Sequence, residues 1–241
     1  STINMKKTII LAALLFVSYS ASSQVLISLL FGDALNSEKI EFGLDGGVNF
    51  ANIANLETSK TLPLFNLGFY FDIKIKNQLM LHTGVLVKSN QGADNLAPYT
   101  LGDPDLDEQF ADGYVTRKIN NFSVPIMLKY RFAERFHIEA GPMLALRTKG
   151  NDEFKATVID EDDLTYKLAI QDNYKRIDAG IMAGAGIKLN KKIPKSAQLG
   201  VRYYYGLVDP LIDNTGDSQN FTSWYLYFSI PIGVNKAEAE K

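Results

Sequence analysis

The chain has 241 residues, a net charge of −2, 46% hydrophobic residues and no cysteine. The nearly balanced charge gives no support for nucleic-acid binding, and the lack of cysteine excludes disulfides, thiolate metal sites and a lipid-modified N-terminal cysteine. Beyond the N-terminus, no apolar run reaches the roughly 18 residues of a membrane-spanning helix.

Residues 1–23 are predicted to be a cleaved signal peptide with a few upstream residues. The basic start MKK (5–7) precedes TIILAALLFV (8–17), an apolar core of signal-peptide length that is too short for a membrane anchor. Ala21-Ser22-Ser23 forms a small-x-small cleavage site. We therefore expect the mature chain to start near Gln24, outside the cytoplasm.

The rest of the chain is expected to form three parts. The apolar segment 24–37 does not alternate, and it predicts either a short amphipathic helix at a membrane surface or a plug near a barrel mouth. Residues 38–234 are predicted to form one β-barrel, and 235–241 (NKAEAEK) a charged, solvated tail.

Eight segments of the barrel region alternate between apolar and polar residues, which is the period of a β-strand. In chain order they are 40–50, 65–75, 79–88, 122–132, 136–147, 177–189, 198–207 and 224–233. Each is long enough to cross a bilayer, for which a tilted strand needs roughly 9 to 11 residues. The turns KNQ, AER and NKKIPKSA are short, whereas 93–116, 150–174 and 209–220 are predicted to be long loops. The pattern indicates an all-β, eight-stranded, antiparallel up-and-down transmembrane barrel.

Alternation alone also fits a secreted, lipocalin-like barrel with its apolar face inward. Eleven of the 18 glycines fall in the polar phase of the strands. A face in contact with water has no need to lose side chains, whereas the interior of a small barrel is crowded. We therefore expect the polar, glycine-rich face inside and the apolar face toward lipid.

The fourth segment, FSVPIMLKYRF (122–132), then directs Lys129 and Arg131 into the lumen. A hairpin about AER places Lys129 opposite Glu139, and a hairpin about KNQ places Asp72 opposite His82. The predicted structural lumen network consists of Lys129, Glu139, Asp72, His82, Arg131 and Arg202. Other charges predicted to face the lumen are Glu41, Asp45, Asp178, Lys74, Lys88 and Lys188. Pro125, which cannot donate to a ladder, predicts a bulge or a locally unpaired site.

Charge is distributed unequally between the two ends of the predicted barrel. The segment 93–116 carries six acidic residues and no basic residue before Arg117, and DEDD (160–163) lies in the second long loop. The short turns are basic. We assign the acidic loops to the cell exterior and the turns to the periplasm, and expect aromatic residues such as Tyr130 and Trp224 at the lipid interfaces.

The strand motifs FGLDGGVNFANI, FSVPIMLKYRF, IEAGPMLAL, DAGIMAGAGIKL and QLGVRYYYGL occur in this order along the chain. In these motifs and their spacing, the chain resembles the PorT-like outer-membrane β-barrel family of Bacteroidetes-type bacteria. The resemblance implies an eight-stranded barrel in the cell outer membrane and says little about activity. One branch of the family assists a protein-secretion system, which makes a secretion-system protein a candidate partner.

No catalytic, cofactor or metal site is predicted. The two histidines, His82 and His137, are interpreted as packing residues of the lumen, and DPDLDE (103–108) lacks the glycine and glutamate that an EF-hand loop requires. The expected function is that of a structural or interaction barrel, whose acidic loops contact lipopolysaccharide or a partner. A narrow channel or small-solute transporter, and a secreted ligand-binding barrel, are the alternatives.

Overall fold

The computed structural model describes residues 36–56, 58–157, 164–190, 192–212 and 218–232. The predicted signal peptide, nearly all of the segment 24–37 and the tail 235–241 lie outside this part. Within it are nine strands: β1 (Ile40–Ile53), β2 (Leu62–Lys74), β3 (Leu79–Leu96), β4 (Tyr114–Phe132), β5 (Phe136–Ala156), β6 (Leu164–Ala169), β7 (Ile177–Lys188), β8 (Gln198–Gly206) and β9 (Phe221–Pro231). Two short helices, α3 (Pro104–Gln109) and the 3-10 turn η2 (Gln171–Asn173), lie in the connections. Neither of them, nor any other described helix, has the length and apolarity to span a membrane.

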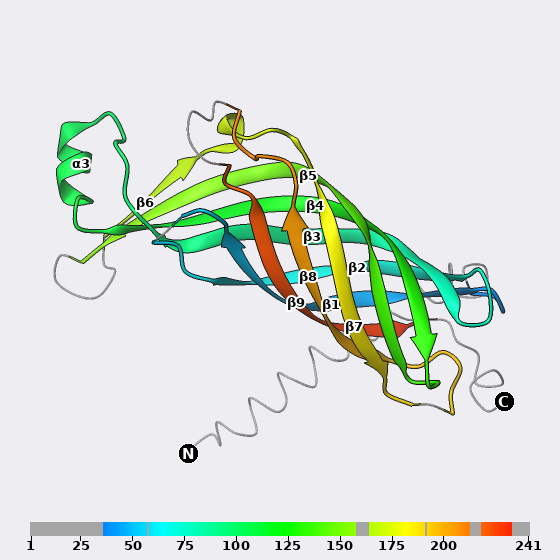
Figure 1. Cartoon of the computed structure of the whole chain (residues 1–241). Coiled ribbons are helices and arrows are strands. Elements are labelled where there is room, and N and C mark those ends of the chain that lie inside the picture. Colours follow the sequence, from blue (N-terminus) through cyan, green and yellow to red (C-terminus); the bar gives the residue numbers. More distant parts are fainter. Residues whose placement is uncertain (1–35, 57, 158–163, 191, 213–217, 233–241) are drawn as a thin grey trace, which may run out of the picture.

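Eight of these strands close into a ring, as predicted. Each strand pairs antiparallel with its neighbours in the order β4-β3-β2-β1-β9-β8-β7-β5, and the β4–β5 ladder closes the circle. The ninth strand, β6, pairs only with the far part of β5, from Asn151 to Ala156. The barrel is therefore eight-stranded, with an extra short strand added above one wall (Figure 1).

The segments 93–116 and 150–174, predicted to be long loops, are partly strand. β3, β4 and β5 continue beyond the ring and, with β6 and α3, form a projection that we call the paddle (residues 91–119, 150–156 and 164–170; Figure 1). Bulges between Leu86 and Ser89, between Ala93 and Leu96, and between Asn120 and Asn121 interrupt the ladders at and beyond the base of the paddle. Because a bulge shifts the phase of alternation, the periodic signal of each strand ends before the strand does.

The faces of the barrel are oriented as predicted. The polar phase is buried, and large apolar residues are exposed around the outside, as on Phe65, Leu128, Ile181 and Leu226. Outward aromatic pairs lie near both ends of the strands: Phe132 stacks on Phe136 at the short-turn end, and Tyr203 contacts Trp224 toward the other end. An exposed apolar band between two levels of aromatic residues is typical of a barrel in lipid.

Two lysines predicted to face the lumen are exposed instead. Lys88 lies within the register shift between Leu86 and Ser89 of β3, which turns its side chain outward over the ring of Phe65. Lys74 is the last residue of β2 and lies at the open short-turn end.

Proline is accommodated by interrupting a ladder. Pairing between β3 and β4 stops after Thr83–Ile126 and resumes, in the same register, at Leu86–Ser123. The gap contains Pro125, so of the two predicted alternatives the locally unpaired site is confirmed and the bulge is not. The β4–β5 ladder has a similar gap opposite Pro142, between the pairs Leu128–Ala140 and Pro125–Met143.

Candidate functional site

Arg202 of β8 lies at the centre of the lumen and is almost fully buried. Its Nε donates to Glu139 Oε1 of β5 at 2.6 Å and its Nη1 to Asp45 Oδ2 of β1 at 2.7 Å. The guanidinium lies 3.7 Å from the ring centroid of Tyr227. One cation therefore links carboxylates on two walls, with geometry favourable enough to compensate part of the desolvation cost.

Lys129 of β4 forms the second centre. Its Nζ lies 2.7 Å from Asp72 Oδ2 and 2.6 Å from Gln198 Oε1. The other oxygen of Asp72 contacts Nδ1 of His82 at 2.6 Å, and Nε2 of His82 lies 3.2 Å from Arg202 Nη2. Because arginine can only donate, the imidazole is assigned as the neutral Nδ1–H tautomer, donating to Asp72 and accepting from Arg202. His82 thus joins the two centres.

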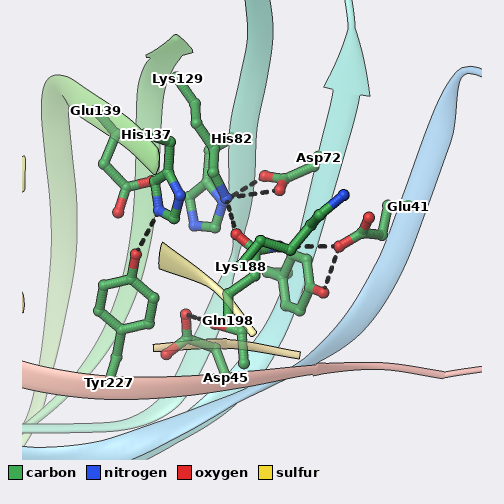
Figure 2. Close-up of polar contacts among 12 residues, drawn as sticks. Glu41, Asp45, Asp72, His82, Lys129, His137, Glu139, Lys188, Gln198 and Tyr227 are labelled. Atoms are coloured by element: carbon green, nitrogen blue, oxygen red, sulfur yellow. Dashed lines mark hydrogen bonds and ion pairs between the residues drawn. The ribbon is translucent and has the colours of Figure 1, made fainter. Parts of the chain in front are cut away.

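Further contacts extend the network to the remaining walls (Figure 2). Gln198 donates to Glu41 Oε1 at 3.0 Å, and Tyr70 donates to the same oxygen at 2.8 Å. His137 contacts the hydroxyl of Tyr227 at 2.7 Å. The network therefore draws side chains from β1, β2, β3, β4, β5, β8 and β9, and it fills the lumen of a barrel that is just wide enough for its own side chains.

The glycines of β7 leave room for the large side chains of this network. Glu139, Gly184 and Arg202 are consecutive partners in one row across β5, β7 and β8, and a Cβ on Gly184 would lie 2.8 Å from Arg202 Cγ. His137 and Tyr227 similarly meet over Gly186 and Gly200. The glycines allow large side chains to lie flat against the wall and reach partners two or three strands away.

The six predicted network residues are placed as follows. Lys129 is the register partner of Glu139, and Asp72 that of His82, as predicted. The ion pairs differ, because Lys129 binds Asp72 and Glu139 binds Arg202. Arg131 lies at the short-turn mouth, where it lines a pocket together with Glu41 and Asp72, and its Nε and Nη2 make no hydrogen bond within the described residues.

The sequence does not reveal which partners meet across the lumen. The alternation places Asp45 and Gln198 correctly on the lumen side of their strands. No signal in the sequence links Asp45 with Arg202 or Gln198 with Lys129, because the members of each pair are more than 60 residues apart along the chain. These pairings follow from closure of the ring, which brings distant strands face to face. Hairpin geometry, by contrast, fixes only neighbouring strands.

The paddle has an apolar inner face, whereas the inner face of the barrel is polar. The residues buried on the inner face of the paddle are Ala93, Leu96, Phe110, Val115, Ile119, Phe154, Ala156 and Ile170. Outside lipid, the other face of the sheet meets water, so the apolar side of each strand turns inward. The polarity of the inner face therefore inverts where the strands leave the ring.

One buried ion pair anchors the paddle. Arg117 donates from Nε and Nη2 to Asp152 at 2.8 and 2.6 Å, and Tyr99 donates to the same carboxylate at 2.9 Å. Burial, with the negative charge of Asp152, raises the pKa of Tyr99 above its ordinary value, so the phenol stays protonated as a donor. The contact fixes the loop 97–103 onto β4 and β5.

The tip of the paddle carries the acidic residues. Asp103 caps α3 by accepting from the backbone N–H of Asp105 at 3.0 Å, and Asp107 accepts from Thr100 Oγ1 and Leu101 N, both at 2.6 Å. Within the described residues, no group of three or more His, Cys, Asp or Glu side chains is arranged to hold a metal ion.

A protein-family model described as "Outer membrane protein beta-barrel domain" matches residues 28–211. The chain belongs to this family. It lies in the cell outer membrane, where barrels direct their long loops outward and their short turns to the periplasm. The match confirms a general outer-membrane barrel family, and its description does not name the PorT-like family. A search of curated protein sequences gives no match.

Several solved structures are similar at low sequence identity. Ail, the attachment invasion locus protein of Yersinia pestis, is 11% identical, with a TM-score of 0.43 and coverage of 81% of this chain and 100% of that chain. It has also been solved with the heparin analogue sucrose octasulfate. Neisserial surface protein A is 13% identical (TM-score 0.40; 80% and 99% covered), and OprG from Pseudomonas aeruginosa is 12% identical (TM-score 0.38; 80% and 93% covered).

Proposed function

We propose that this protein is a sealed outer-membrane anchor that displays the paddle to a partner at the cell exterior. The observation that carries the proposal is the bridge from Asp45 through Arg202 to Glu139, which crosses the lumen in a single pair of short hydrogen bonds. Moving these charges aside for a solute would leave them unpaired in a low-dielectric interior, which is strongly unfavourable. Transport through the lumen is therefore disfavoured.

The paddle supports the interaction half of the proposal. It has its own apolar core, a buried Arg117–Asp152 pair and a capped helix at its tip, so it is a rigid element rather than a loose loop. Its tip exposes Asp105, Glu108 and Asp112. A basic protein surface, or lipopolysaccharide contacted through divalent cations, fits this charge.

The order of the strand motifs supports placement in the PorT-like family. The basic start, the apolar core and the small-x-small site support a cleaved signal peptide within residues 1–23. We infer no catalytic role. His82 and His137 both hydrogen-bond within the lumen network, and neither faces the outer rim, where a substrate on the cell surface would arrive.

Single-cysteine labelling tests the proposal cleanly because the chain has no cysteine of its own. In intact cells, Gln109→Cys at the paddle tip is expected to react with a membrane-impermeant maleimide. Ser123→Cys, fully buried on the lumen wall of β4, is expected to resist small hydrophilic thiol reagents. Rapid labelling at Ser123→Cys in a folded barrel would favour the channel, and an unreactive Gln109→Cys would contradict the display of the paddle.

A further inference from the structure

The barrel wall has a notch where β5 changes partners. The β5–β7 ladder ends at the pair Leu146–Ile177, and the β5–β6 ladder begins at Asn151–Ala169. Two backbone hydrogen bonds span the interval, from Arg147 N to Arg176 O at 2.7 Å and from Ile170 N to Gly150 O at 2.9 Å. Between them lies a pocket of about 450 Å³, which we call the rim notch.

Positive charge dominates the rim notch. Its lining includes Arg147, Lys149, Arg176, Asp172, Tyr174 and Ile212. The side chains of Lys149 and Arg176 are exposed, and neither has a side-chain partner among the described residues. Among the described residues that line it, two exposed cations and the buried Arg147, which is paired with Asp178 outside the lining, accompany one carboxylate over an apolar floor.

Arg147 is the buried member of the set. Its side chain is 4% exposed, its Nη1 donates to the carbonyl of Lys175 at 2.6 Å, and its Nη2 lies 3.1 Å from Asp178 Oδ1. Its Nε makes no hydrogen bond within the described residues. The same guanidinium lies 5.5 Å from the ring centroid of the buried Phe221. The unused N–H can still donate to an added acceptor, and leaving such a group unpaired costs free energy.

The position of the rim notch relative to the membrane indicates which molecule would supply that acceptor. Leu146 and Ile177, the last rung below it, are 48% and 68% exposed and belong to the lipid-facing band. The next rung is Arg147 with Arg176. The cations therefore begin one residue above the hydrocarbon, at the level of the outer-leaflet headgroups, whose phosphates are anionic.

A second pocket continues the same band of charge. It has a volume of about 470 Å³, shares Thr148 with the rim notch, and is lined by Lys88, Lys118 and Asn120. None of the described residues that line it is acidic. The bulge that turned Lys88 out of the lumen thus places it beside Lys118 at the headgroup level.

We propose that the rim notch binds a phosphate group of an outer-leaflet lipid, with Arg147, Lys149 and Arg176 as donors and the neighbouring lysines supporting a second anionic group. The proposal rests on the outward direction of the long loops but is independent of the sealed lumen. Arginine and lysine pair with phosphate through charge-assisted hydrogen bonds, and an apolar floor suits the start of an acyl chain.

Native mass spectrometry of the barrel released from phosphatidylcholine nanodiscs tests this proposal, with bis-phosphorylated lipid A as the probe. We expect the wild type to retain lipid A and Lys149→Ala/Arg176→Ala to retain about tenfold less or lower, because two charged donors are lost. The matched control is Lys76→Ala/Lys192→Ala, which removes the same charge from the periplasmic turns. Heat-dependent gel migration verifies that each barrel is folded.

Two further measurements identify the chemical group that is bound. Lipid A without its phosphates is expected to be lost from the wild type, and inorganic phosphate is expected not to displace intact lipid A. Equal retention of the dephosphorylated lipid, or by Lys149→Ala/Arg176→Ala, would overturn the proposal. Displacement by inorganic phosphate would reassign the rim notch to the free ion. None of these outcomes depends on whether the lumen conducts or the paddle has a partner.

Discussion

Arg202 on β8 reaches Glu139 on β5, two strands away, because Gly184 of β7 lies between them in the same row. Any larger residue at that position would occupy the path of the arginine side chain. One row of residues across three paired strands therefore contains both the glycine that leaves space and the ion pair that seals the lumen.

Replacement of Arg202 should strongly destabilise the barrel. Arg202→Met leaves Asp45 and Glu139 buried without their cation, and we expect the free energy of unfolding to fall by about 3–5 kcal/mol. Urea titration in lipid vesicles, followed through the single tryptophan Trp224, measures the change. Arg176→Met, at an exposed arginine, is the control and should change the value by less than about 0.5 kcal/mol. Equal midpoints for the two variants would contradict the central role of Arg202.

Adjacent positions on β7 should differ in their tolerance of a larger side chain. Gly184→Val inserts a side chain beneath Arg202 and should cost about 1–3 kcal/mol of unfolding free energy, through overpacking. Ala185→Val also places a valine on β7, but on the exposed, lipid-facing side, and should be nearly neutral. The same urea titration compares them, and a neutral Gly184→Val would show that the lumen is less tightly packed than described.

Loss of Asp152 should loosen the paddle without opening the barrel. Asp152→Ala leaves Arg117 and Tyr99 without their shared acceptor, and we expect local stability to fall by about 2–4 kcal/mol. Hydrogen exchange of residues 97–119 should accelerate, while heat-dependent gel migration stays unchanged. Glu153→Ala is the matched control, because its 3.5 Å contact with the exposed Lys167 is worth little. Unaltered exchange in Asp152→Ala would exclude the anchoring role.

The loop before α3 should loosen in acid. The hydrogen bond from Thr100, with that from the Leu101 amide, lowers the pKa of Asp107 below its ordinary value of 3.8. A lowered carboxyl pKa stabilises the fold above the ordinary value, and this contribution is lost as the pH falls through the lowered pKa. Hydrogen exchange of residues 99–102 should therefore rise in that range in the wild type but not in Asp107→Asn. Asp105→Asn should keep the wild-type profile, and a flat wild-type profile would refute the assignment.

The barrel itself follows from the sequence because every spanning strand obeys the same constraint. Lipid fixes one face as apolar, so alternation marks Phe122 to Phe132 without ambiguity, and the short turns then fix pairs such as Lys129 with Glu139. Glycines in the polar phase correctly indicated a crowded interior.

The paddle could not be predicted in the same way. A bulge is one extra residue and leaves no mark in composition, yet it reversed the orientation expected for Lys88. Beyond the membrane the apolar side of each strand turns inward. Val115 and Phe154 therefore do not fit the alternation expected of a lipid-facing strand, and their segments were predicted to be loops. The contact of Arg202 with Asp45 depends on ring closure, which no local pattern encodes.

Single-channel recording of the purified wild-type barrel in planar bilayers tests the sealed lumen most directly. We expect a quiet baseline, with no steady conductance steps, from protein whose folding is verified by heat-dependent gel migration. Reproducible unitary steps from the folded wild type would mean that the Arg202 network leaves a conducting path, and would contradict the central claim.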